Sequence, residues 1–122
     1  MSGTSTANTP APVQLPSMQA GETDSRYMDC TPDLGPVGDT FPSTAVLAVV
    51  ITRQDGNAIT ANDLALTKTP SLDPTQLIPT FWYLAPLLSA GVWYNLVLTA
   101  NTTTQGRLFK RTFTMYVSAQ LG

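Results

Sequence analysis

Few side chains in this sequence are able to do acid–base, nucleophilic or metal chemistry. The chain has no histidine and a single cysteine, Cys30. A thiol activated by histidine and a zinc site built from several cysteines are therefore both excluded. The serine and threonine hydroxyls lack a histidine base, and neither Lys68 nor Lys110 stands in a motif that activates a nucleophile. We expect a protein that is not an enzyme and that needs no cofactor.

Acidic side chains gather in the first third of the chain, and they are the candidates for a metal site. They are Glu22, Asp24, Asp29, Asp33 and Asp39. Carboxylate oxygens bind Ca²⁺, but this spacing matches no EF-hand loop, and prolines interrupt it. Aspartate is also common in turns, where its carboxylate accepts backbone N–H groups. The sequence therefore favours turn chemistry and no metal site.

The charges are distributed unevenly along the chain. Residues 1–40 carry five acids and one base, whereas residues 81–122 carry no acid and three bases, Arg107, Lys110 and Arg111. One interpretation is that the three bases form a solvated surface. The other is that they contact the acidic stretch 22–39, within one subunit or between two, where charge pairing selects partner and register. The three bases are therefore candidates for a subunit interface.

The overall composition excludes several classes of partner. The net charge is −2 with only 6 basic residues, too few for the positive surface that nucleic-acid binding needs. No apolar run approaches the roughly 18 residues of a membrane span. The N-terminal residues lack the basic and apolar regions of a secretory signal. We expect no nucleic acid, membrane or small-molecule substrate as partner, and a buried, reduced Cys30 in a protein assembled in the cytoplasm.

Residues 1–26 have the composition of an extended N-terminal arm. The segment contains three prolines and many small polar residues but no aromatic residue. Such a segment buries too little apolar surface to offset its ordering entropy. One interpretation is a mobile tail, and the other is an arm that becomes ordered on a neighbouring subunit. For the second, Val13, Leu15 and Met18 are the spaced apolar anchors.

Residues 27–122 have the pattern of one β domain. Apolar and polar residues alternate over 92–100 and again over 107–118, which predicts two strands joined as a hairpin. The aromatic segment 80–84 predicts another strand, and the continuous apolar run 45–52 favours a strand buried on both faces. About six or seven short strands separated by turns indicate a small antiparallel β-sandwich.

Three adjacent aromatic residues, Phe81, Trp82 and Tyr83, must point alternately to the two faces of their strand. If Trp82 points inward, Phe81 and Tyr83 point outward and expose large apolar groups. That arrangement indicates a partner surface, so both residues are candidates for a subunit interface. The alternative is that a second sheet or the N-terminal segment covers them.

Several short motifs together resemble a known family. They are Ala20-Gly21-Glu22, Tyr27-x-Asp29, Leu34 ahead of Gly38-Asp39-Thr40, Ser89-Ala90-Gly91-Val92-Trp93-Tyr94-x-Leu96, and Thr102-Thr103-x-x-Gly106-Arg107 before Phe113-x-x-Tyr116-Val117. This pattern, over roughly residues 20–118, resembles the small virion proteins of tailed bacteriophages described as fiber–tail adaptors, and more broadly the Ig-like domains of phage structural proteins. The resemblance implies an Ig-like β-sandwich without catalysis or cofactor.

The resemblance also implies a location and partners. We expect a structural protein of the virion, assembled in the bacterial host cytoplasm, that joins tail, portal or fiber proteins and copies of itself through multivalent contacts. One alternative is a capsid decoration, or cement, protein built from the same small domain. A further alternative is an Ig-like module that binds carbohydrate or acts in adhesion.

Three residues are expected to have structural roles. Gly91 and Gly106 lie in expected turns before the two hairpin strands. In Ig-like sandwiches a tyrosine near such a corner hydrogen-bonds back to the loop backbone, and we expect Tyr94 to do so. Removing that hydroxyl is then expected to cost about 1 kcal/mol, the net contribution of one hydrogen bond.

Overall fold

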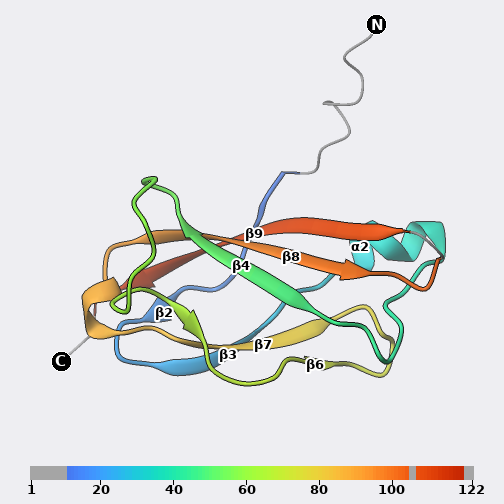
Figure 1. Ribbon diagram of the computed structural model, residues 1–122, viewed down its shortest axis with the longest axis horizontal. Coiled ribbons are helices and arrows are strands. Elements are labelled where there is room, and N and C mark those ends of the chain that lie inside the picture. The colour runs from blue at the N-terminus through green and yellow to red at the C-terminus, as the bar shows by residue number, and fades with distance from the viewer. Residues whose placement is uncertain (1–10, 105–106, 120–122) are drawn as a thin grey trace, which may run out of the picture.

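The computed structural model describes residues 11–104 and 107–119, which form short strands and single turns of helix (Figure 1). The strands are β1 (Val13–Gln14), β2 (Met18–Gln19), β3 (Thr23–Tyr27), β4 (Ala48–Arg53), β5 (Ala65–Leu66), β6 (Ser71–Leu72), β7 (Pro79–Leu84), β8 (Trp93–Asn101) and β9 (Leu108–Ser118). The helical turns are α2 (Thr31–Leu34), η1 (Gly35–Val37) and η2 (Leu87–Ser89). None of the helices in this part of the chain has the length and apolar composition that crossing a membrane requires.

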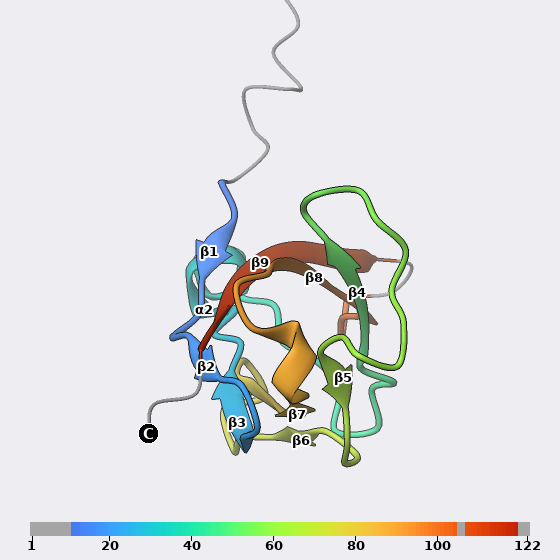
Figure 2. The ribbon, with the colours of Figure 1, turned by 90° about the vertical axis from the view of Figure 1, so that its left-hand side faces the viewer.

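The strands form two sheets that lie in separate layers, as the end-on view in Figure 2 shows. One sheet has the order β1-β9-β8-β4, with β2 also paired to β9. The other has the order β3-β7-β5, with β6 also paired to β7. The all-β class is thus confirmed. The expected purely antiparallel pairing is wrong, because β1 and β2 both run parallel to β9.

The hairpin of β8 and β9 forms the centre of the larger sheet. Its pairing is antiparallel from Trp93 opposite Tyr116 to Asn101 opposite Leu108, as the alternating pattern predicted. The inward side chains of the two strands are fully or nearly buried. They are Tyr94, Leu96, Leu98 and Ala100 on β8, and Phe109, Phe113, Met115 and Val117 on β9. The period of two in the sequence therefore placed these two strands correctly and grouped the residues that share a face.

The N-terminal segment from residue 13 onward belongs to the sheets, so the expected boundary at residue 26 is wrong. Leu15 and Met18 are 4% and 0% exposed within the core of their own chain, whereas Val13 stays 37% exposed on the edge strand β1. The segment then crosses to the second sheet, where β3 pairs with β7. Its apolar residues are few, but Leu15, Met18 and Ala20 reach the space between the sheets, and β9 supplies the hydrogen bonds that a lone arm lacks.

The apolar run 45–52 does not form a strand buried on both faces. It contains β4, an edge strand that pairs only with β8 among the described strands. Exposed and half-buried residues alternate along it, and Val46 and Val50 are 83% and 60% exposed. Only one face of β4, with Val49 and Ile51, packs against the core. A uniform apolar run contains no signal that distinguishes these two arrangements.

The aromatic strand β7 points the opposite way from the expectation. Phe81 and Tyr83 are 1% and 0% exposed, so they are core residues and not an interface between subunits. Turning two large rings inward buries more apolar surface than turning in Trp82 alone. Trp82 instead lies half-buried under the Lys68 ammonium, whose nitrogen is 4.1 Å from the ring centroid.

The connection into β8 depends on Gly91. Its φ is +83°, in the left-handed region, and its N–H donates to the Val117 carbonyl at 2.7 Å. The corresponding expectation for Gly106 falls on a residue outside the described part of the chain. A side chain at position 91 would meet no atom within 4 Å, so the constraint there is backbone conformation and not space.

Gly91→Ala is therefore expected to lower the free energy of unfolding by about 1–2 kcal/mol, the cost of a left-handed non-glycine residue. Gly35→Ala is the matched control, because Gly35 has φ −57° and its added methyl would make only an ordinary contact at 3.4 Å. Urea denaturation of both variants measures the difference. Equal stabilities for the two alanine variants would contradict this interpretation of the turn.

Candidate functional site

Of the three basic residues near the hairpin, Arg107 precedes β9, and Lys110 and Arg111 lie on it. Two of the three pair with aspartates of the same chain. Arg107 lies 3.6 Å from Asp39, and Arg111 lies 3.3 Å from Asp33. The interpretation that these bases contact the acidic stretch 22–39 is confirmed within one chain for these two. Lys110, between them, is exposed on the other face of β9. Of the three bases, Lys110 therefore remains the candidate for a contact between subunits.

Asp33 and Asp39 hold the segment between β3 and β4 against the end of the hairpin. Asp39 is 2% exposed, and its carboxylate accepts from the Thr103 hydroxyl at 2.8 Å and the Thr40 N–H at 2.9 Å. Arg111 interrupts the inward face of β9, and its side chain reaches Asp33 in the helical turn α2. Within the described residues, no group of three acidic or cysteine side chains is placed to hold a metal ion. These carboxylates act as turn and ion-pair partners.

A second buried aspartate, Asp63, joins β4 and β8 to the loop after β4. It accepts from the Tyr94 hydroxyl at 2.7 Å and from the Arg53 guanidinium at 3.0 Å. The Thr60 N–H donates to its other oxygen at 2.8 Å. Tyr94 therefore does hydrogen-bond to a loop, but its acceptor is a carboxylate after β4 and not the backbone that was expected.

The Tyr94–Asp63 contact shifts the two pKa values in opposite directions, that of Tyr94 upward and that of Asp63 downward. Burial, and after it the hydrogen bond to Asp63, raise the pKa of Tyr94 to about 12, which favours the neutral hydroxyl. Burial opposes ionisation of Asp63, but donors led by Tyr94 and the Thr60 N–H outweigh it and lower the pKa of that carboxyl. A neutral tyrosine thus donates to an ionised aspartate over the physiological range.

The outward side of the β4–β8–β9 sheet carries almost no charge, and we call it the outer face. It consists of Ala48, Val50 and Thr52 from β4, Trp93, Asn95, Val97 and Thr99 from β8, and Lys110, Thr112, Thr114 and Tyr116 from β9. Lys110 is the one charged residue of this set. Sequence reasoning missed the outer face, although the lack of charge at alternate positions of three strands was the signal for it.

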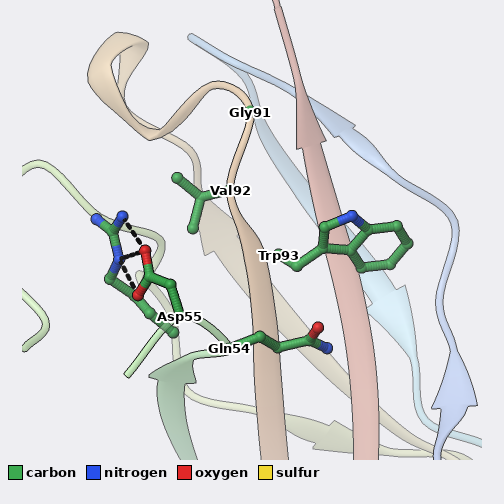
Figure 3. Close-up of a pocket in the computed structure, with 6 residues that line it drawn as sticks. Gln54, Asp55, Gly91, Val92 and Trp93 are labelled. Atoms are coloured by element: carbon green, nitrogen blue, oxygen red, sulfur yellow. Dashed lines mark hydrogen bonds and ion pairs between the residues drawn. The ribbon is translucent and has the colours of Figure 1, made fainter. Parts of the chain in front are cut away.

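At one end of the outer face lie an aromatic pair and two amides. The rings of Trp93 and Tyr116 are 5.1 Å apart, and the Gln54 amide donates to the Asn95 side-chain oxygen at 3.0 Å. Figure 3 shows Trp93 and Gln54 pointing to one side of β8, with Val92 and Asp55 on the other. A shallow hollow of about 340 Å³ lies among these residues and Gly91.

The hollow has no group free for acid–base work. Arg53 and Asp55 bind each other, with Arg53 Nη2 2.6 Å from the Asp55 carboxylate. This pairing lowers the pKa of Asp55 to about 2 through the hydrogen bonds from Arg53. What the hollow offers a partner is a half-exposed indole with neighbouring amides. Cys30, the one thiol, is fully buried, and burial raises its pKa to about 12, so it stays protonated.

Comparison of the chain with protein-family models and with curated protein sequences gives no match.

Tyr94→Phe is expected to lower the free energy of unfolding by about 2 kcal/mol, because it removes a buried hydrogen bond to an ionised acceptor. This is more than the 1 kcal/mol or so of a neutral hydrogen bond. Tyr116→Phe is the control, since Tyr116 lies on the outer face and is only half-buried. Chemical denaturation of the two variants tests this, and a loss at Tyr116 equal to that at Tyr94 would contradict it.

Stability is also expected to fall at alkaline pH. The pKa of Tyr94 rises from about 10 in an unfolded chain to about 12 in the fold. Its contribution is therefore complete below about pH 10 and is lost as the pH rises through about 12. Tyr83 and Cys30, whose pKa values burial also raises, act in the same direction. Denaturation midpoints between pH 9 and 11.5 should fall less steeply in Tyr94→Phe than in the wild type, and parallel curves would argue against the assignment.

Proposed function

We propose that the two sheets form an Ig-like β-sandwich and that the protein is a non-enzymatic structural component of a tailed-phage virion, acting as an adaptor in the tail or at the head–tail or fiber junction. It works by repeated contacts with other virion proteins and with copies of itself, where several weak contacts add up through avidity. The location comes from the family resemblance of the sequence motifs. The mode of action comes from the surface.

The observation that carries the mode of action is the outer face. A sheet surface with one charged side chain among eleven residues loses little hydration energy when another protein covers it. Several charged residues elsewhere are already paired, such as Arg107 with Asp39 and Arg53 with Asp55. The described residues thus combine a nearly uncharged, threonine-rich contact surface with no free pair of catalytic groups.

A second candidate, a carbohydrate-binding or adhesion module, is favoured by the end of the outer face. Trp93 is 39% exposed, and the Gln54–Asn95 amide pair lies on the same face. An aromatic ring beside a few amides is a common way of holding a polar ligand that also has apolar surfaces. The hollow there is shallow, so this module would bind by stacking and not by enclosing its ligand.

Immunogold electron microscopy of purified particles, with antibody to residues 27–122, tests the proposal. We expect label at the tail, collar or fiber base, and none after the antibody is absorbed with pure protein. Label spread evenly over the head would contradict the adaptor function and support that of a cement protein. A third outcome is that particles carry no label, while the free protein binds glycans and the Trp93→Ala variant does not. That outcome would overturn both virion functions in favour of the binding module.

A further inference from the structure

The outer face ends at β4, and β4 has an open edge. Figure 1 shows β4 at the front of the molecule, and β8 is its one partner among the described strands. The Gln54 N–H donates to the Trp93 carbonyl across the β4–β8 pair. Because alternate residues of a strand direct their N–H and C=O groups to opposite sides, Val49 and Ile51 direct theirs away from β8. These groups are available to another strand.

The other sheet edges have features that discourage pairing, whereas β4 has only Arg53 at its last position. β1 and β2 lie between or beside prolines, β3 carries Asp24 and Arg26, and β5 and β6 are two residues long. Proline, charge and shortness are the usual protections of an exposed edge. Residues 43–52 contain neither proline nor charge. Val46 and Val50 are also the two most exposed apolar residues of that segment.

We propose that β4 is a homodimerisation edge, at which two copies of the chain pair antiparallel across a two-fold axis that passes beside Val50. Residues directly opposite in an antiparallel pair point to the same face. Val50, an outer-face residue, must therefore meet another outer-face residue. Centring the axis on Val50 achieves this, places Val49 opposite Ile51 of the second copy, and keeps the pairing within the strand.

Three observations favour a second copy as the occupant. The uncharged edge brings no like charges together when it meets itself, and a two-fold axis needs only such a self-complementary surface. The nearest charge, Arg53, is already neutralised by Asp55 and Asp63. The N-terminal end of the same chain enters the structure at β1, the opposite edge of this sheet.

Pairing at β4 would join two outer faces into one continuous sheet surface. The dimer deepens the proposed function, because it names a second copy of the chain as one of the partners. The inference rests on the proposed function only where it concerns the assembled particle. The dimer itself is a property of the pure protein and is tested there.

Cysteine cross-linking of the full chain tests the register. Since Val49 and Ile51 make the hydrogen bonds, the two Val50 residues form a non-hydrogen-bonded pair with Cα atoms about 4.5 Å apart. That distance lies within the range of a disulfide. Val50→Cys should therefore give a covalent dimer under mild oxidation, reversed by reductant. Cys30 is fully buried and should not compete.

Val46→Cys is the matched control. Position 46 is more exposed than position 50, yet in this register the two copies of it lie roughly 27 Å apart along the strands. It should stay monomeric on a non-reducing gel. A mixture of Ala48→Cys and Thr52→Cys chains should cross-link, because these positions are opposite, whereas either variant alone should not. Equal cross-linking at positions 46 and 50 would overturn the register.

Val50→Lys tests the association itself. It places two ammonium groups beside the axis, on an exposed position where the monomer still folds. Light scattering should show the mass fall from twice 13.0 kDa to that of one chain, with an unchanged circular dichroism spectrum. A wild-type protein that is monomeric at all concentrations overturns the proposal. So does a dimer that persists in Val50→Lys but is lost when residues 1–10 are deleted. Failure of particle labelling with an intact dimer would count against the proposed function alone.

Discussion

The crossing of the N-terminal segment from one sheet to the other is the constraint on which the rest of the structure depends. β1 and β2 pair with β9, and β3 pairs with β7, so residues 13–27 close one side of the molecule. Arg26 reinforces the crossing by donating to the carbonyls of Pro16 and Ser17 at 2.9 and 2.7 Å. Leu15 and Met18 fill the space behind it. No equivalent segment pairs with β4 on the other side among the described residues, and the molecule is open there.

Asp63 compensates in part for this asymmetry. On the open side no strand of the described residues bridges β4 to the second sheet, and side-chain hydrogen bonds run from Tyr94 and Arg53 to one buried carboxylate. That carboxylate lies directly before Leu64, which is 1% exposed, and before β5 of the second sheet. The network therefore adds a side-chain link between the two layers on this side, and leaves the N–H and C=O groups on the free edge of β4 unused.

The fold could be predicted where one chain segment determines its own structure. β7, β8 and β9 follow from alternation and aromatic content, and the uneven charge pointed to pairs such as Arg107 with Asp39. The direction of Phe81 and Tyr83 could not be predicted, because a period of two defines two faces without saying which is inward. The strands β1 and β2 are two residues long, and only their distant partner β9 makes them strands. The acceptor of Tyr94 likewise comes from a loop that the sequence does not place beside it.

An uncharged open edge is difficult to explain in a protein that acts alone. Proteins protect free edges because an unprotected edge templates further pairing, and this chain does so at every described edge except β4. Its surface is also poor in charge, with 11% charged residues, so electrostatic repulsion between copies is weak. An unprotected edge on such a surface favours association, and a two-fold pairing has the advantage that it forms a closed dimer. Once β4 is paired with its own copy, its free groups are satisfied and no further edge of that kind remains to propagate aggregation.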